Sequence, residues 1–114
     1  EVVDLLAALN TGHEGGCGTV HANSAADVPA RLEALALAAG LGRAALHAQV
    51  AAGLDAVIHV GRDPAGVRSV RDVCVLRPDE QLLVRAIPAL HFVGGAVHEG
   101  PGLAWLQQRL DEAA

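Results

Sequence analysis

The sequence predicts an α/β fold, in which helices pack against a β-sheet. Apolar residues recur at helical spacing along 28–35 and 43–54, which indicates two amphipathic helices. Two runs, 55–61 and 67–76, are rich in Val and Ile and flank a turn-like stretch, which indicates a β-hairpin. Aromatic residues make up only 2% of the chain, so the core must be built from Ala, Val and Leu. That composition favours helices laid on a sheet.

The N-terminal part of the chain predicts a helix, a loop and a short strand. Residues 2–9 carry apolar side chains at helical spacing, and the following "NTG" is a usual helix stop. After several glycines, "CGTVHA" ends in residues that suit β structure, so a strand is predicted at 17–22. In such a strand Cys17, Thr19 and His21 share one face.

A capped helix is predicted next. Ser24 with Asp27 three residues later resembles a capping box, and Pro29 is tolerated in a first helical turn. The helix should end at Gly40 or Gly42, because glycine commonly follows the last helical residue.

The centre of the chain predicts a second helix and then a β-hairpin. The helix is expected over 43–54. The run 55–61 is expected to be a buried strand, "RDPAG" a turn, and 67–76 a second strand with partly alternating polarity. The apolar face of the helix includes Leu46, Val50 and Leu54.

The C-terminal part predicts weaker strands and a final helix. A strand pair is expected in 81–90 and 91–100, with Pro88 placing the first strand at a sheet edge or ending it early. Residues 103–113 predict an amphipathic helix, with Trp105 as its anchor in the core. The whole chain, 1–114, is expected to be one domain or part of one.

Composition and charge argue against several classes of protein. A net charge of −5 disfavours direct binding of nucleic acid, which needs clustered basic residues. No apolar run reaches the roughly 18 residues that a membrane helix needs, and no signal peptide is evident. The two cysteines are therefore expected to be reduced thiols in a cytosolic protein. Since the chain contains no Met, we expect Glu1 to lie inside a longer reading frame or to follow a processing site.

The stretch from Asn10 to Ser24 concentrates glycine, histidine and hydroxyl side chains and allows three interpretations. It could be a phosphate-sensing loop, in which glycines let the backbone approach a ligand that His and Thr side chains bind. It could be a metal site, because His13, Cys17 and His21 are spaced by four, although the glycines between them disfavour a helix. It could also be a glycine turn before a buried strand. The residues alone leave all three open.

Three motifs occur in a fixed order along the first third of the chain. They are "DLLAALNTGH" at 4–13, "TVHAN" at 19–23 and "RLE" at 31–33. Their order and spacing resemble the histidine box of the type II/IV secretion-system ATPase family, most closely its pilus-assembly and conjugal-transfer branch. The likeness continues more loosely through "AGL" at 39–41 and "LDAVIHV" at 54–60, so roughly half of the chain carries it closely.

The resemblance implies a fold and an assembly. The fold would be the C-terminal half of a RecA-like (P-loop NTPase) motor domain, with a β-hairpin extension and a C-terminal helix. Members of the family work as hexameric ATPases that are cytoplasmic and peripheral at the inner face of the cell membrane. There they act on an inner-membrane platform protein of a secretion or pilus machine. ATP and Mg²⁺ are the implied cofactors.

The resemblance also implies roles for individual residues. His21 would lie near the γ-phosphate of ATP and link the nucleotide state to domain movement, and His13 would belong to the same box. Arg31 and Glu33 would have structural or inter-subunit roles, with Glu33 on a solvated helix face. The residues that would shape the nucleotide site beside the histidines are Thr11, Gly12, Thr19 and Asn23.

The chain departs from the family pattern because it has no P-loop and no Lys. In the family those parts lie upstream of the segment that begins here at Glu1. We therefore expect this segment to be inactive alone and ATP and Mg²⁺ to be bound mainly by residues upstream of it. No arginine can be assigned as one that reaches across the ring. Two alternatives stay open, a non-catalytic oligomerisation or partner-binding module derived from this fold and a small metal-binding protein.

Overall fold

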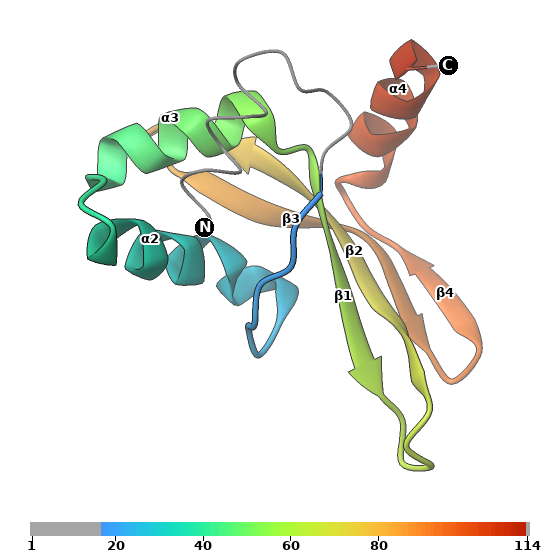
Figure 1. Cartoon of the computed structure of the whole chain (residues 1–114). Helices are drawn as coiled ribbons and strands as arrows, with labels where there is room; N and C mark the ends of the chain where they lie inside the picture. Colours follow the sequence, from blue (N-terminus) through green and yellow to red (C-terminus); the bar gives the residue numbers. More distant parts are fainter. Residues whose placement is uncertain (1–16, 114) are drawn as a thin grey trace.

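A computed structural model describes residues 17–113 of the chain (Figure 1). Four antiparallel strands form one sheet in the order β1-β2-β3-β4, so each strand pairs with its neighbour in sequence. The strands are β1 (Ala56–Arg62), β2 (Arg68–Pro78), β3 (Val84–Val93) and β4 (Ala96–Glu99). The helices are η1 (Ala25–Asp27, a 3₁₀ turn), α2 (Val28–Ala38), α3 (Arg43–Gly53) and α4 (Leu103–Ala113).

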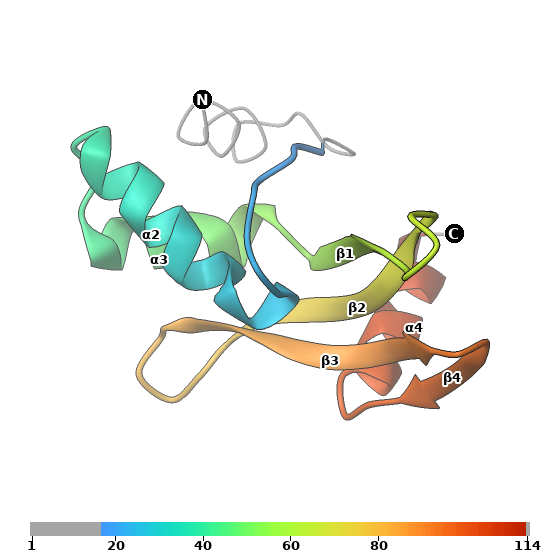
Figure 2. The same ribbon diagram turned by 90° about the horizontal axis from the view of Figure 1, so that it is seen from below.

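The predicted class, helices packed on a β-sheet, is confirmed. Helices α2 and α3 lie on one face of the sheet, and α4 lies on the other (Figure 2). Every strand pair in the described part of the chain is antiparallel. None of these pairs includes the strand predicted at 17–22, so the RecA-like assignment stays a prediction.

The core lies between the α2–α3 pair and the sheet. Its side chains are all aliphatic, as the composition predicts, and each large one stabilises the fold by about 1.5–3 kcal/mol on burial. The two helices come from adjacent parts of the chain, and strands β2 and β3 supply the opposite wall. The buried cluster comprises Val28, Leu32, Ala36, Leu46, Val50, Leu76 and Val84.

Helix α2 is preceded by the η1 turn and stopped by Gly40. Ser24 Oγ donates to the carboxylate of Asp27 at 3.0 Å, and no side chain caps the backbone at this end, so the predicted capping box is wrong. At the other end Gly40 has φ 88°, and the Leu41 N–H donates to the Ala36 carbonyl at 2.8 Å. This left-handed glycine stop is the one that was predicted.

The prediction of a buried strand at 55–61 is wrong, because β1 is an edge strand with one exposed face. Ile58 and Val60 are 64% and 49% exposed, whereas Val57 and His59 are half-buried. Strand β1 has a single neighbour, and helices cover only one side of it. Its apolar residues on the other side therefore face solvent.

The predicted turn between β1 and β2 forms. Asp63 Oδ1 accepts a hydrogen bond from the Val67 N–H at 2.9 Å, and Gly66 adopts φ 84°. The pairing that follows shifts register after His59, where Arg71 is the extra residue of β2.

The strand pair predicted in 81–100 also forms, but Pro88 is not at an edge. Strand β3 runs unbroken through Pro88 and lies between β2 and β4. The register with β2 shifts between Val73 and Cys74, so a bulge at this point accommodates a residue that has no N–H to donate. The chain turns instead at two consecutive glycines with positive φ, 94–95.

Helix α4 covers 103–113, as predicted, and begins at a point of close backbone contact. The Gly102 N–H donates to the Pro88 carbonyl at 2.8 Å. A Cβ on Gly102 would lie 2.8 Å from Val75 Cγ2, so no larger residue fits there without movement. Across residues 17–113, the helices are all too short or too polar to span a bilayer.

Candidate functional site

The segment 17–24 crosses one end of the core without regular secondary structure. Val20 and Ala22 are half-buried and pack against the core cluster. The alternate residues face solvent, so the segment has one apolar side and one polar side. The polar side carries, in order, Thr19, His21 and Asn23.

The prediction of a strand at 17–22 is wrong, because this segment makes no strand-to-strand hydrogen bonds within the described residues. Within the part of the chain that the structure describes, the sheet contains only β1 to β4, and none of them pairs with this segment. A strand without a ladder partner leaves its backbone groups to water, which explains the irregular backbone. The alternation of faces is nevertheless present, because Thr19 and His21 are both exposed.

The polar side of the segment offers free hydrogen-bonding groups. No residue within 17–113 makes a hydrogen bond or ion pair with the His21 ring. A hydroxyl, an imidazole and a carboxamide on one side of an extended segment can all donate to an anionic oxygen. The other residues predicted for this site, Thr11, Gly12 and His13, lie outside the described residues.

Glu33 of the "RLE" motif connects α2 to α3. Its Oε1 accepts a hydrogen bond from Arg43 Nε and lies 3.5 Å from His47 Nε2. The Glu33 side chain is only 28% exposed, so it does not lie on a solvated helix face as predicted. Arg31 is exposed, and in the described structure it forms no ion pair.

His47 extends this connection to the sheet. The residue is 4% exposed, and its Nδ1 accepts a hydrogen bond from the Val84 N–H of β3 at 2.8 Å. Because Nδ1 is the acceptor, the ring proton is on Nε2, which lies toward Glu33. Glu33 thus joins α2 to α3 through Arg43, and His47 joins α3 to β3, whereas His47 Nε2 makes no hydrogen bond within the described residues.

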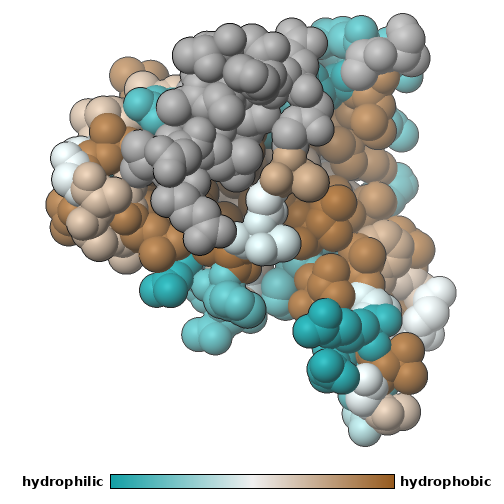
Figure 3. All heavy atoms as spheres, viewed as in Figure 1, coloured by the Kyte–Doolittle hydropathy of each residue, from teal (hydrophilic) through white to brown (hydrophobic). Residues whose placement is uncertain are grey.

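A row of polar side chains crosses the whole sheet at one register position. His59 of β1 pairs with Asp72 of β2, Asp72 with His91 of β3, and His91 with His98 of β4. The Asp72 carboxylate is 3.3 Å from His59 Nδ1 and 2.6 Å from His91 Nδ1. Figure 3 shows hydrophilic and hydrophobic atoms side by side at the end of the sheet near the β1–β2 turn.

Nothing in the sequence indicates that these histidines belong together. They are far apart along the chain, and only the strand register brings them onto one face. The two oxygens of the Asp72 carboxylate each lie within hydrogen-bond distance of one neighbouring imidazole, so both are already engaged. The sequence could reveal this row of side chains only if the register of all four strands were already known.

The described residues do not form a metal centre. Among residues 17–113, no group of three His, Cys, Asp or Glu side chains is arranged to hold a metal ion. Cys17 is exposed and Cys74 is buried, and both are free thiols. Burial, together with the charge of Asp72, raises the pKa of Cys74. The predicted trio of His13, Cys17 and His21 extends beyond the described residues.

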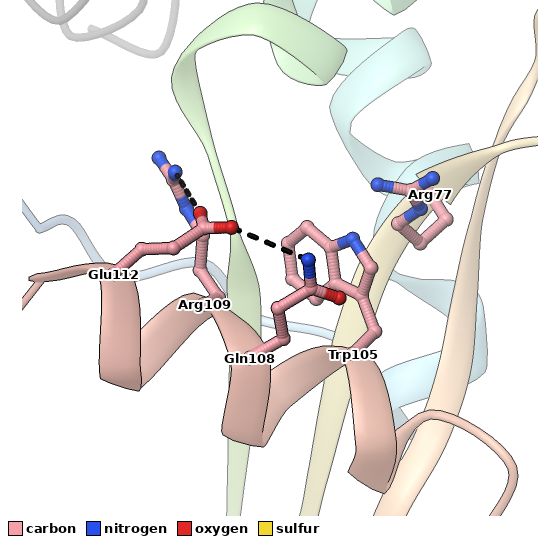
Figure 4. Close-up of a pocket in the computed structure, with 5 residues that line it drawn as sticks. All are labelled: Arg77, Trp105, Gln108, Arg109 and Glu112. Atoms are coloured by element: carbon pink, nitrogen blue, oxygen red, sulfur yellow. Dashed lines mark hydrogen bonds and ion pairs between the residues drawn. The ribbon is translucent and has the colours of Figure 1, made fainter.

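A small hollow of about 190 Å³ lies beside α4 (Figure 4). The Arg77 guanidinium lies over the Trp105 ring, 4.9 Å from its centre. Trp105 therefore contacts an arginine at the surface and does not anchor α4 in the core as predicted. Arg109 pairs with Asp55 and Glu112, which raise the pKa of Arg109, Asp55 the more strongly. Since Arg109 is already paired, we assign the hollow to the packing of α4.

Comparison with known proteins identifies the family. The protein family described as "Type II/IV secretion system protein" matches residues 1–79 of this chain. This chain belongs to that family. The match contains the whole segment 17–24 and both Glu33 and His47, and it ends just after β2. The family predicted from the three motifs is therefore confirmed.

Curated relatives in this family are described as conjugal transfer proteins. Putative conjugal transfer proteins of two Mycobacterium tuberculosis strains, CDC 1551 / Oshkosh and H37Rv, are each 58% identical over 103 residues. The probable conjugal transfer protein TrbB of Sinorhizobium fredii is 39% identical over 69 residues. The matches cover 90% and 60% of this chain but only 29% and 20% of those relatives. The chain thus spans less than a third of their length.

Proposed function

We propose that this chain is part of an ATP-driven motor for conjugal transfer or a related secretion process, with His21 as a contact to the γ-phosphate of ATP. Membership of the secretion-system family supports the process, and the names of the relatives favour conjugal transfer within it. The proposal covers pilus assembly as well as conjugal transfer and secretion. The motor would be the longer protein of which this segment spans less than a third.

The exposed polar side of segment 17–24 carries the proposal. Val20 and Ala22 fix the segment to the core, so the side chain of His21 is held outward without a described partner. A hydrogen bond from the imidazole to a γ-phosphate oxygen would exist before hydrolysis and be lost after it. The segment leads into η1 and then α2, so a shift of His21 would reach the "RLE" helix through the short η1 turn alone.

The donor set fits a phosphate better than it fits a magnesium ion. The side chains of Thr19, His21 and Asn23 can donate to phosphate oxygens. Magnesium prefers carboxylates and water, and the polar side of this segment carries no carboxylate. We therefore propose that ATP and Mg²⁺ are held mainly by a P-loop and acidic residues elsewhere in the longer protein. That protein would form a hexamer at the cytoplasmic face of the inner membrane, where it would act on a platform protein.

The test is a His21→Gln substitution in the longer protein. Glutamine keeps a donor but replaces the imidazole, so binding of ATP should change little while hydrolysis slows. We expect kcat to fall about 10- to 100-fold with KM within about threefold, the effect of one hydrogen bond to a charged group. Steady-state hydrolysis of ATP with magnesium measures both constants.

His98→Gln is the matched control, because His98 is an exposed histidine on β4 outside segment 17–24. It should leave both constants unchanged. An unaltered kcat in His21→Gln would contradict the proposed contact. If the longer protein hydrolyses no ATP at all, the non-catalytic assembly module is the better account.

A further inference from the structure

Two histidines face each other across the β3–β4 hairpin, which extends away from α2 and α3 (Figure 2). His91 and His98 are direct register partners, and the centres of their rings are 6.4 Å apart. The turn between the strands consists of Gly94 and Gly95, both with positive φ, as in a tight two-residue hairpin. Because such a turn fixes the register, both rings are held on the same face of the sheet.

Asp72 sets the orientation of the His91 ring. One oxygen of the carboxylate, Oδ1, lies 2.6 Å from His91 Nδ1. Because an ionised carboxylate can only accept a hydrogen bond, this contact places the proton of the neutral ring on Nδ1 and leaves the lone pair on Nε2. Nε2 is on the opposite edge of the ring from Nδ1. It is therefore directed away from β2, toward the side of the sheet where β4 carries His98.

A carboxylate behind a histidine is typical of protein metal sites. A histidine that binds a metal usually donates its other ring N–H to a carboxylate, which fixes the tautomer and makes the ligating nitrogen more basic. The His91 side chain is 50% exposed, so an ion can reach it from solvent. His98 is exposed as well, and within residues 17–113 no hydrogen bond occupies its ring. Two neighbouring strands thus each offer a free imidazole nitrogen.

We propose that His91 and His98 bind one divalent transition-metal ion, such as Zn²⁺ or Ni²⁺, with Asp72 as the residue that positions His91. Neutral imidazole suits these ions. A bond from zinc to a histidine nitrogen is about 2.0–2.1 Å long, so two rings that share an ion have their centres roughly 5–6 Å apart. The separation of 6.4 Å is close to this value, and a small rotation of two exposed side chains closes the difference.

The site is an open one with two protein ligands. Among residues 17–113 no three side chains are arranged around an ion, so water would complete the coordination. Magnesium prefers oxygen ligands and does not compete for this pair. Hydrolysis of ATP measured with magnesium alone therefore leaves the pair empty, and His98→Gln should remain silent in that assay. The proposal is independent of the proposed function.

The first measurement is a calorimetric titration of the purified 114-residue chain with ZnCl₂ or NiCl₂ near neutral pH. We expect one ion per chain and a dissociation constant of about 1–100 μM, because two ligands form about half the bonds of a closed zinc site. Binding should disappear as the pH is lowered toward 5, since protonated imidazoles cannot bind a metal.

Variants assign the ion to its ligands. His98→Gln removes one of two ligating nitrogens and should raise the dissociation constant at least about tenfold. Asp72→Asn should raise it about 10- to 100-fold, the usual effect of altering a carboxylate that positions a metal-binding histidine. His59→Gln is the matched control, because His59 lies on the other side of Asp72 and should leave the constant within about threefold. Circular dichroism checks that each variant is folded.

Electron paramagnetic resonance of bound Cu²⁺ separates a ligand from a positioning residue. The couplings to the ion count the imidazole nitrogens that bind it. The unaltered chain should show two, His98→Gln should show one, and Asp72→Asn should still show two at saturating copper. A loss of Asp72 that acted only by disturbing the fold would not preserve the two-nitrogen signal.

Three outcomes would overturn the proposal. A dissociation constant above about 1 mM for the unaltered chain shows that the pair does not hold an ion. Binding that survives His98→Gln but is lost in His21→Gln places the ion at the trio predicted from the sequence, His13, Cys17 and His21. An affinity unchanged in Asp72→Asn shows that the carboxylate does not position His91. None of these results depends on whether the longer protein hydrolyses ATP.

Discussion

Leu82, in the turn between β2 and β3, is a bulky apolar residue in a backbone conformation that suits glycine. Its φ is 64°, and it is the only non-glycine residue within 17–113 with a positive φ. Its side chain is 74% exposed, so packing does not offset the strain. Its N–H donates to the Asp79 carbonyl at 3.0 Å, which holds the turn in this shape.

We therefore expect Leu82→Gly to stabilise the fold by about 0.5–1 kcal/mol, less than the full strain because glycine is more flexible when unfolded. Thermal unfolding followed by circular dichroism measures the change. Gln81→Gly is the control, since the neighbouring residue has no positive φ and should lose stability. A melting temperature that falls in both variants would show that Leu82 is not strained.

Asp79 organises the same turn through its carboxylate. The side-chain hydrogen bond from Arg85, and then the N–H groups of Leu83 and Gln81, lower the pKa of Asp79 below its ordinary 3.8. A lowered pKa in the folded state means that this contribution to stability is complete above pH 3.8. It is lost as the pH falls through the folded pKa.

The corresponding variant is Asp79→Asn. It should be less stable than the unaltered chain at pH 7, and the difference should shrink as the pH is taken below 3.8, where Asp79 becomes protonated. Urea unfolding at a series of pH values measures both. Glu80→Gln, at an exposed neighbouring carboxylate, should show no such convergence. A pH-independent gap between Asp79→Asn and the unaltered chain would assign the effect to something other than the charge.

At the scale of elements, single side chains join helices to strands. Glu33 of α2 pairs with Arg43 of α3, and His47 of α3 binds the backbone of β3. Removing the His47 imidazole would leave the buried N–H of Val84 without an acceptor. Such a group costs about 1–3 kcal/mol.

We expect His47→Leu to destabilise the fold by at least about 1–3 kcal/mol. Equilibrium unfolding in urea measures it. His98→Leu, at an exposed histidine on β4, should change stability by less than about 0.5 kcal/mol. Equal effects of the two substitutions would contradict a special role for the link through His47.

The start of α4 provides a second prediction at this scale. Gly102→Ala would place a Cβ 2.8 Å from Val75 Cγ2 and 2.9 Å from the Ile87 carbonyl, so α4 would have to move away from the sheet. We expect a loss of about 1–3 kcal/mol. Gly42→Ala, where nothing lies within 4 Å of an added Cβ, should cost less than about 1 kcal/mol. Comparing the free energies of unfolding of the two variants distinguishes crowding at position 102 from a general effect of replacing glycine.

Elements could be predicted from the sequence where the signal is local. Helices α2, α3 and α4 and the turn at Gly66 follow from apolar spacing and glycine stops, which depend only on near neighbours. The exposure of β1 and the central place of β3 were mispredicted. Both depend on which strand lies next to which, and a proline tolerated by a bulge in β3 is indistinguishable in sequence from a proline at an edge.

At the scale of the whole molecule, we expect the 114-residue chain alone to be catalytically inert. It has no Lys and no P-loop, so nothing in it can cradle the β- and γ-phosphates. Magnesium-dependent release of phosphate from ATP should stay at the buffer background, with the longer protein as the positive control. Turnover well above that background by the purified segment would contradict the proposal that the P-loop lies elsewhere.

The candidate site was predictable only in part. The polar residues from Thr19 to Asn23 were identified by motif, and their exposure follows from simple alternation. The cross-strand row of His59, Asp72, His91 and His98 was not identified, because four separate registers must be known before its members meet.

The order of the strands has a consequence for how this unit forms. Each strand pairs with the one synthesised immediately before it, so the sheet is a meander whose contacts join residues close in sequence. Short chain closures cost little entropy, and such topologies fold faster than sheets with distant pairings. Emerging from the ribosome, β1 can pair with β2 as soon as the turn at Gly66 is complete. The sheet can therefore assemble one hairpin at a time during translation, from β1 toward α4.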